Sequence, residues 1–241
     1  MAELFCGTSG FSYESWIGRF YPKRIRAADM LPFYASRLNS VELNTTFYHW
    51  PKPSSLQAWA AAAPEEFRFA IKAHRWLANP LNVERFEAGL PELRDLYGTL
   101  GPALGPLLFK LPPPAAASTE RLGQFLRLVP AGWRVAFEFS HPSWEADDVT
   151  RLLEDAGAAA CAVDDGPERP SPRGAYLYLR LRRDRYGAKA LAGWAERITA
   201  ALAQGRDAYV YFKHQAAGPA RAQRLRTLVQ TSARPIVRPG V

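Results

Sequence analysis

VAFEFSHPSW, residues 135–144, begins as a short apolar strand and ends in three side chains suited to a ligand, Glu138, His141 and Trp144. Seven further segments repeat this pattern of an apolar strand followed by polar or aromatic residues. They recur at roughly 30-residue intervals, and most are followed by a helical pattern. This succession is typical of βα units that form a parallel sheet.

The predicted strands and helices alternate along the chain. Strands are expected at 4–7, 41–47, 67–76, 106–110, 135–138, 158–164, 175–186 and 208–215. Helices are expected at 27–38, from a cap at Ser54 or Ser55 to the residue before Pro64, and at 91–104, 118–129, 147–156, 189–204 and 219–229. Between strands six and seven, DGPERPSPRG leaves no room for a helix, so a Pro/Gly loop is expected there.

The eight-fold repeat favours a closed barrel over an open sheet. We therefore predict a single (β/α)8 TIM barrel of the α/β class, with one domain over residues 1–241. No low-complexity or charged tract divides the chain.

The amino-acid composition indicates which kinds of binding partner the protein can have. The hydrophobic fraction of 48% is ordinary, and no run of about 18 apolar residues suggests a membrane span. We expect a soluble, cytoplasmic protein without membrane association, and nothing implies a protein partner. The net charge of +8 favours an anionic partner, either a small molecule or nucleic acid. The alternative is that GC-rich codon usage places arginine on the solvated surface, which would give the same net charge without a functional meaning.

The candidate site lies at the strand ends, because loops after barrel strands vary without disturbing the interior. In strand order the inward-capable polar residues are Glu42, Asn44, Lys72, Lys110, Glu138, Asp164, Arg180 and Lys213. Four cations then meet three carboxylates in one basin, which is a setting that perturbs pKa values. A buried salt-bridge network that only closes the barrel mouth is the alternative.

Several chemical roles are open to these residues. Glu138 with Asp164 or Glu42 can form a general acid and base pair if their separation is suitable. Lys72, Lys110 or Lys213 can act as a Schiff-base nucleophile, although gripping an anion is the commoner role of lysine. We take Glu138, Asp164 and Lys72 as the catalytic candidates.

Metal and cofactor sites are not expected. The histidines at 49, 74, 141 and 214 stand singly on separate loops, without HxH or HExxH spacing. Cys6 and Cys161 fit no metal spacing and are expected to be buried, reduced thiols. The usual glycine-rich nucleotide motifs and GxSxG are absent, so no cofactor is predicted.

Aromatic residues accumulate at the same strand ends. They are Phe11, Tyr13, Trp16, Tyr48, Trp50, Trp76, Trp144 and Tyr186. They can stack a base or a sugar ring, or they can simply cover the barrel top. The cationic run Arg180, Arg182, Arg183 and Arg185 can touch phosphates where it is exposed.

The motifs GTSGFSYESWIGRFYP, VELNTTFY, FRFAIKA, GPLLFKLPPP, FEFSHPSW and AYVYFKHQAAG resemble the YecE-like family, also called domain of unknown function 72, over nearly the whole chain. The resemblance implies a TIM barrel with no established activity. By motif it implies as site or rim residues Ser9, Gly10, Tyr13, Trp16, Glu42, Asn44, Phe47, Tyr48, Lys72, Glu138, His141, Trp144 and Asp164.

The chain also departs from the family pattern. Lys110 stands where Gln is expected, Ser140 where Arg is expected, Arg182-Arg183 where His-Gly is usual, and Lys213-His214-Gln215 where Asn-Asn-Asp is usual. These replacements change the hydrogen-bonding groups at four of the predicted strand ends.

Three functions follow as expectations. The first is binding of an anionic, phosphate-bearing ligand at the C-terminal rim, where the carboxylates could add acid/base chemistry. Its ligand-binding residues are Ser9, Tyr13, Glu42, Asn44, Tyr48, Lys110, His141, Trp144, Arg180 and Lys213. The second is a nuclease-like barrel that binds nucleic acid, and the third is a sugar-processing enzyme that uses the carboxylates. The sequence leaves open whether the protein is an enzyme.

Overall fold

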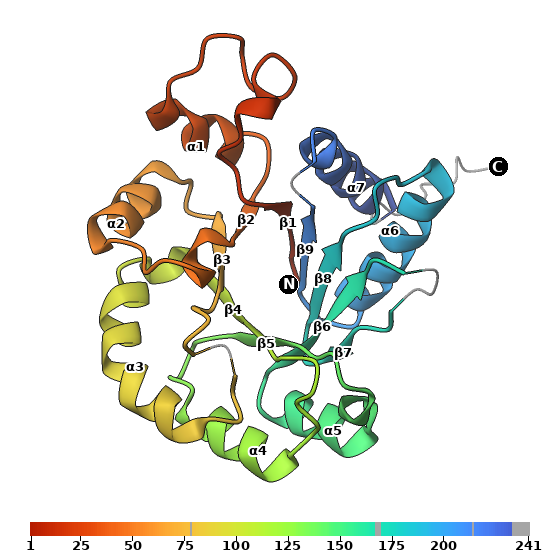
Figure 1. Cartoon of the computed structure of the whole chain (residues 1–241). Helices are drawn as coiled ribbons and strands as arrows, with labels where there is room; N and C mark the ends of the chain where they lie inside the picture. The colour runs from red at the N-terminus through yellow and green to blue at the C-terminus, as the bar shows by residue number, and fades with distance from the viewer. Residues whose placement is uncertain (78, 167–169, 214, 233–241) are drawn as a thin grey trace, which may run out of the picture.

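A closed barrel of parallel strands forms the centre of the protein (Figure 1). The computed structural model describes residues 1–77, 79–166, 170–213 and 215–232. Within them the barrel strands are β1 (Leu4–Ser9), β2 (Ser40–Leu43), β3 (Arg68–Lys72), β4 (Leu104–Lys110), β5 (Val135–Glu138), β6 (Ala159–Asp164), β8 (Leu177–Leu181) and β9 (Ala208–Phe212). Parallel pairing of β1 with β9 and of β5 with β6 closes the ring, so the predicted α/β barrel is confirmed.

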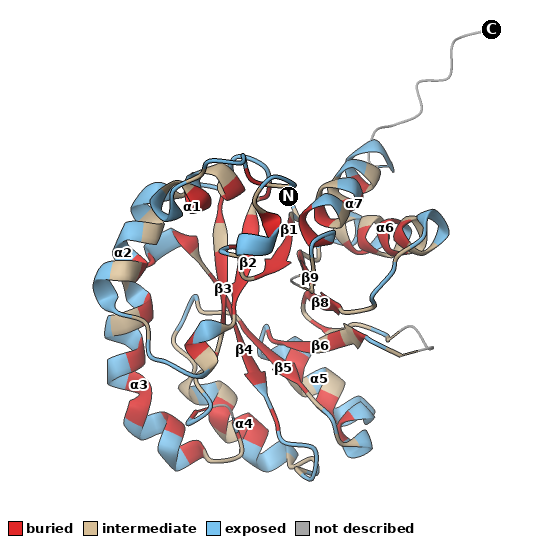
Figure 2. Cartoon of the chain, turned by 45° about the horizontal axis from the view of Figure 1, so that its top comes forward, coloured by how far each residue is buried: buried red, intermediate tan, exposed pale blue. Residues whose placement is uncertain are grey.

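The helices surround this barrel (Figure 1). They are α1 (Ala27–Ala35), α2 (Pro53–Ala62), α3 (Val83–Gly98), α4 (Thr119–Leu128), α5 (Asp147–Asp155), α6 (Ala188–Ala203) and α7 (Gly218–Ser232). Short 3-10 helices lie at Glu14–Trp16, Thr45–Phe47, Gly101–Ala103 and Pro142–Glu145. Figure 2 shows that the helices turn buried faces to the strands and exposed faces outward, as their amphipathic sequences require. None of the helices in the described part of the chain is long and apolar enough to span a bilayer.

The connection from β6 to β8 carries no helix in its described residues. A two-residue strand, β7 (Arg173–Gly174), pairs antiparallel with the start of β6. Residues 167–169 of the predicted Pro/Gly loop lie outside the described residues.

The core has two parts because side chains of a strand point alternately inward and outward. Outward-facing residues pack against the helices in one large apolar cluster. Inside the barrel lies a second cluster, composed of Phe5, Ala70, Leu108, Ala136, Ala159, Tyr176, Tyr178, Tyr209 and Tyr211. Bulky tyrosines on β8 and β9 face alanines on β3, β5 and β6, which fills the interior and leaves the polar residues at its upper end.

Several predicted elements are corrected, and strands β3, β8 and β9 end at Lys72, Leu181 and Phe212, before the predicted ends at 76, 186 and 215. Helix α3 begins at Val83 and not at Pro91, since Asn82 caps it by accepting a hydrogen bond from the backbone N–H of Arg85 at 3.1 Å. Neither serine caps α2, which begins with Pro53 at its first turn. Strand β2 ends at Leu43, and the chain then turns into a 3-10 helix.

Other expectations about the chain are confirmed in part. Ser118 caps α4, its hydroxyl accepting from the N–H of Arg121 at 3.3 Å. Both cysteines are free thiols, Cys6 buried and Cys161 partly buried. The predicted single domain extends at its C-terminal end beyond the described residues.

Candidate functional site

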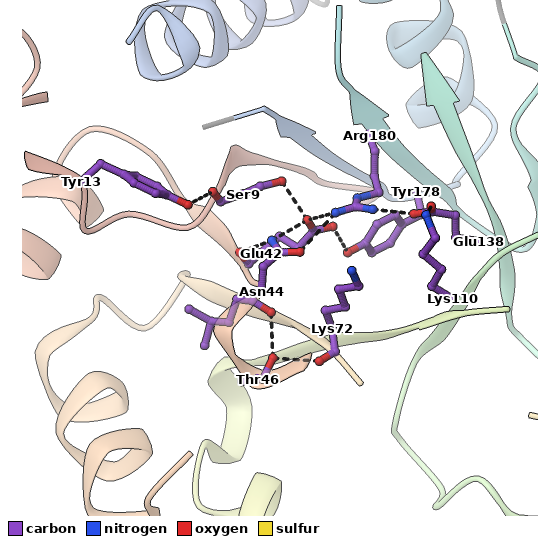
Figure 3. A network of polar contacts seen from close by, with 11 residues as sticks. Ser9, Tyr13, Glu42, Asn44, Thr46, Lys72, Lys110, Glu138, Tyr178 and Arg180 are labelled. Carbon is purple, nitrogen blue, oxygen red and sulfur yellow. Dashed lines mark hydrogen bonds and ion pairs between the residues drawn. The ribbon is translucent and has the colours of Figure 1, made fainter. Parts of the chain in front are cut away.

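A layer of charged side chains closes the upper end of the barrel interior (Figure 3). Its centre is Arg180 on β8, whose guanidinium reaches two carboxylates on other strands. Nη2 lies 2.8 Å from Oε1 of Glu42 on β2, and Nη1 lies 2.5 Å from Oε2 of Glu138 on β5. All three residues are buried. Ring closure of the sheet therefore brings together charges that are up to 138 residues apart in sequence.

Glu42 is held by neutral donors as well as by Arg180. Oε1 accepts hydrogen bonds from the Ser9 hydroxyl at 2.8 Å and from Asn44 Nδ2 at 2.9 Å. Oε2 accepts from the Tyr178 hydroxyl at 2.9 Å. Burial alone would raise the pKa of Glu42, but the charges of Arg180 and Arg182 and the hydrogen bonds from Asn44 and Arg180 outweigh it and hold the pKa at about 2.

The backbone at the end of β1 fixes this arrangement. Gly10 adopts φ +81°, which favours glycine, and its N–H donates to the Glu42 carbonyl at 2.8 Å. The turn directs the Tyr13 hydroxyl onto the carbonyl of Ser9 at 2.8 Å. Ser9 and Tyr13 thus support the Glu42 side of the layer.

Glu138 is shared between two cations. Besides Arg180, Lys110 at the end of β4 places Nζ 2.5 Å from Oε1 of Glu138. Burial raises the pKa of Glu138, whereas Arg180 and Lys110 lower it, and the net result lies below the ordinary value. Glu138 is therefore ionised near neutral pH and is a poor proton donor.

Lys72 at the end of β3 has a different environment. Its Nζ lies 4.1 Å from the centroid of the Phe47 ring and forms no ion pair or hydrogen bond with the described residues. In Figure 3 the ammonium points toward the Glu42–Arg180 pair, and no dashed line joins it to a neighbour. Burial lowers the pKa of Lys72, and the nearby charges of Arg180 and Lys110 lower it further, against the opposing effect of Glu138 and Glu42.

Arg182 adds a further cation close to this layer. Its charge contributes to the low pKa of Glu42, and its side chain has no ion pair with the described residues. We define the cup as the side chains of Glu42, Lys72, Lys110, Glu138, Arg180 and Arg182. Four cations and two carboxylates give the cup a surplus of two positive charges when Lys72 is protonated.

A cavity of about 710 Å³ adjoins the cup on the side of β4, β5 and β6. Lys110 and Glu138 lie in its wall, together with Cys161, which faces the barrel interior. The exposed carboxylate of Asp165 and the side chain of Arg173 also line it. Space for a small ligand is thus available beside the ion pairs.

The expected placement of Asp164 is wrong. Its carboxylate accepts hydrogen bonds from Arg183 Nε at 2.5 Å and from Trp194 Nε1 on α6 at 3.0 Å. Alternation along β6 turns Cys161 inward and Asp164 outward, toward the helices. Asp164 therefore does not form a carboxylate pair with Glu138.

Two further candidates do not share the cup. Lys213 pairs with Asp184 of the loop after β8 at 3.4 Å, so it does not join the expected group of four cations. Trp144 has no exposed area, and its Nε1 donates to the Ala115 carbonyl at 2.8 Å. The ring is part of the core, and Trp144 also borders the cavity beside the cup, so its role in ligand binding stays a prediction.

The remaining candidates lie at the rim. Tyr48 is 60% exposed, and Asn44 approaches the cup by accepting from Arg180 Nη2 at 3.2 Å. His141 caps the 3-10 helix after β5, with Nδ1 2.8 Å from the Ser143 hydroxyl. Roles for these residues in ligand binding stay predictions.

Sequence reasoning missed one residue of the site. Tyr178 lies two positions before Arg180 on the same face of β8, and this spacing was the available signal. Arg182, which the sequence analysis names in the cationic run but not among the ligand-binding residues, lies two positions after Arg180.

The described residues were also compared with the requirements of a metal site. Among the described residues, no group of three or more His, Cys, Asp or Glu side chains is arranged to hold an ion. His74 stacks on Trp50 with ring centroids 4.5 Å apart, and His214 lies outside the described residues.

Comparison with known proteins identifies relatives of this chain. A family model described as "Protein of unknown function DUF72" matches residues 5–240. The UPF0759 protein YecE of Escherichia coli K12 is 26% identical over 154 residues, which cover 61% of this chain and 57% of that protein. The chain thus matches less than two thirds of that relative's length.

Solved structures of two other bacterial proteins share the fold. A DUF72 family protein from Thermotoga maritima MSB8 superposes with a TM-score of 0.71 at 22% identity, covering 95% of this chain and 99% of that one. A DUF72 family protein from Enterococcus faecalis V583 gives a TM-score of 0.75 at 18% identity, with both chains fully covered. At these identities the similarity establishes the architecture.

Proposed function

The chain belongs to the DUF72 family of proteins of unknown function, and we propose that its cup binds a small anionic, phosphate-bearing ligand at the C-terminal ends of the barrel strands. The observation that carries this proposal is the unbalanced charge. Glu42 and Glu138 are already neutralised by Arg180 and Lys110, whereas Lys72 and Arg182 have no carboxylate partner among the described residues.

The position of the surplus charge supports binding from solvent. Arg180 and Glu42 form a buried floor, while Lys72, Lys110 and Arg182 are partly or largely accessible above it. A cation in a partly desolvated site attracts an anion more strongly than one in bulk water. The ligand would thus replace the missing counter-ion.

Carboxylate chemistry is a weaker part of the proposal. Glu42 and Glu138 both have lowered pKa values, so neither carries a proton to donate near neutral pH, and Asp164 faces α6. A glycosidase-like acid and base pair requires one protonated carboxyl group near neutral pH. We therefore do not favour the sugar-processing alternative.

A nucleic-acid-binding barrel is the second candidate. Trp50 and Trp76 are 44% and 47% exposed, and they line a groove of about 960 Å³ together with Arg75 and Arg85. Exposed aromatic rings beside arginines can stack bases and contact phosphates. Its test is binding of a labelled single-stranded oligonucleotide, whose affinity should fall steeply between 50 and 200 mM salt, as is typical of phosphate-contacting proteins.

Ligand-induced stabilisation tests the primary proposal. Thermal and urea unfolding are measured with inorganic phosphate against sodium chloride of equal ionic strength. Phosphate at tenfold its dissociation constant should stabilise the protein by about 1.4 kcal/mol. Lys72→Gln and Arg182→Gln should each weaken this effect, whereas Arg121→Gln, a control at an exposed pair, should not. Equal stabilisation by both salts, or an unchanged phosphate effect in both cup variants, would refute the proposal.

A further inference from the structure

The three lysines at the strand ends differ in their partners. Lys110 is paired with Glu138 at 2.5 Å and Lys213 with Asp184 at 3.4 Å. Lys72 has no ion pair with the described residues and lies over the Phe47 ring. The structure thus separates three residues that sequence alone leaves equivalent.

The groups around Lys72 come from four other strands or their ends. Arg180 on β8 and Lys110 on β4 place like charges near its ammonium, while Glu42 on β2 and Glu138 on β5 oppose them. Both carboxylates form their close contacts with other cations. Like charges and partial burial favour the neutral amine, the form of lysine that attacks carbonyl carbon.

The side chain is also positioned to meet a ligand. Lys72 is half-buried, and its backbone is held where β3 ends, because its carbonyl accepts from the Thr46 hydroxyl at 2.8 Å. Figure 3 shows the extended side chain directed toward the centre of the charged layer. A ligand bound at this layer would meet the Lys72 amine within the field of the cup's other cations.

We infer that Lys72 is a nucleophile that forms a Schiff base with a small anionic aldehyde or ketone. The inference rests on the proposed function, because the surplus positive charge draws the anionic carbonyl compound into the cup. With Lys72 neutral, the cup still carries three cations against two carboxylates. Attraction for an anion therefore does not depend on protonation of the nucleophile.

The reaction balances without an added oxidant or reductant. The Nζ lone pair of Lys72 forms a bond to the carbonyl carbon, and the carbonyl π electrons move to oxygen, which is protonated. The resulting carbinolamine loses this oxygen as water and leaves a protonated iminium. In total, one neutral amine, one carbonyl compound and one proton taken up from solvent give one protonated iminium and one water, so atoms and charge balance.

Reductive trapping identifies the reacting lysine. The protein is incubated with glycolaldehyde phosphate and sodium cyanoborohydride, which delivers hydride to the iminium carbon, and the modified lysine is located by peptide mass mapping. The chain contains six lysines, and the three exposed ones that do not belong to the cup, Lys23, Lys52 and Lys189, serve as internal controls. We expect Lys72 to be modified about tenfold faster than these exposed residues.

The pH profile supplies a second readout. Because the pKa of Lys72 is lowered, its rate of modification should reach a plateau at a lower pH than is usual for a lysine side chain. Lys72→Arg keeps a cation but removes the nucleophile, so the fast modification should disappear while the slow modification of exposed lysines continues. The wild-type map is decisive by itself if this variant does not fold.

The outcomes separate this inference from the proposed function. Modification that follows exposure, fastest at Lys23, Lys52 and Lys189, overturns the inference even if phosphate stabilises the protein. Fast modification of Lys72 by uncharged glycolaldehyde, equal to that by its phosphate, supports the nucleophile and counts against the anion site. Selectivity for the phosphorylated aldehyde, suppressed by inorganic phosphate, supports both.

Discussion

Replacement of Arg180 by Met tests whether the charged layer supports the barrel as the structure indicates. Met keeps much of the apolar length of the side chain and removes the cation that Glu42 and Glu138 share. Glu42 is fully buried and would lose its charged partner, so its ionised form becomes costly in the folded protein.

The expected loss follows from the contacts that survive. Removing one partner of a buried ion pair typically costs about 3–5 kcal/mol. Two carboxylates are affected here, but Glu138 keeps Lys110 and Glu42 keeps the hydroxyls of Ser9 and Tyr178. We therefore expect the free energy of unfolding at pH 7 to fall by about 3–5 kcal/mol in total, and not by twice that amount.

The pH dependence provides the sharper test. In the wild type the pKa of Glu42 is about 2, below its ordinary 4.5, so its stabilising contribution is present above about pH 4.5 and lost as the pH falls. Without Arg180, burial raises the pKa of Glu42 above the unfolded value, so the variant loses stability as the pH rises. The difference between the two proteins should thus be largest at pH 7 and shrink toward pH 4.

Urea unfolding followed by tryptophan fluorescence at pH 7, 5.5 and 4 measures this difference. Arg121→Met is the matched control, because the Arg121–Glu84 pair is exposed and should contribute at most about 1 kcal/mol. The reasoning fails if Arg180→Met lies within about 1 kcal/mol of the wild type, or if its cost is the same at all three pH values.

Three further perturbations address the surroundings of this layer. Tyr178→Phe removes a donor to buried Glu42 and should cost about 1.5–3 kcal/mol in urea unfolding, and a neutral result would contradict the assigned bond. Gly10→Ala forces a side chain into φ +81° against the Tyr13 ring and should cost at least about 1–2 kcal/mol in the same assay. Burial raises the pKa of the Cys6 thiol to about 12 and that of Cys161 well above its ordinary value, so neither should react rapidly with a disulfide reagent at pH 8 until the protein is unfolded; rapid native labelling would disagree.

The barrel could be predicted because its signal is repeated along the chain. Each apolar strand is short and ends in a polar or aromatic cluster. Because eight segments show this pattern, a misplaced boundary at one of them does not change the number of predicted strands. Element boundaries carry no such redundancy. Proline is typical of a helix's first turn, so Pro91 predicts a start there, although buried Val83, Phe86 and Leu90 already follow helical spacing from the Asn82 cap. Packing against the barrel tolerates the proline inside α3.

The site was predictable as a set of charges but not as a set of pairs. Strand alternation places Glu42, Glu138 and Arg180 inward, and closure of the sheet brings them together. Strand β6, by contrast, is apolar on both faces until Asp164, so its sequence does not show which face turns inward. The indole N–H of Trp194 on α6, which binds the Asp164 carboxylate, is a tertiary contact that no local pattern reveals.

Arg180 has both a structural role in the barrel and a place in the cup, so its replacement cannot test ligand binding alone. It spans the barrel from β8 to β2 on one side and to β5 on the other, and these strands are not its neighbours in the sheet. The same side chain therefore covers the apolar interior and forms the base of the cup. Loss of ligand binding in an Arg180 variant would not distinguish a missing contact from a disordered floor. Lys72 and Arg182 have no ion pairs with the described residues, so their replacement removes charge from the cup and leaves the Glu42–Arg180–Glu138 bonds in place.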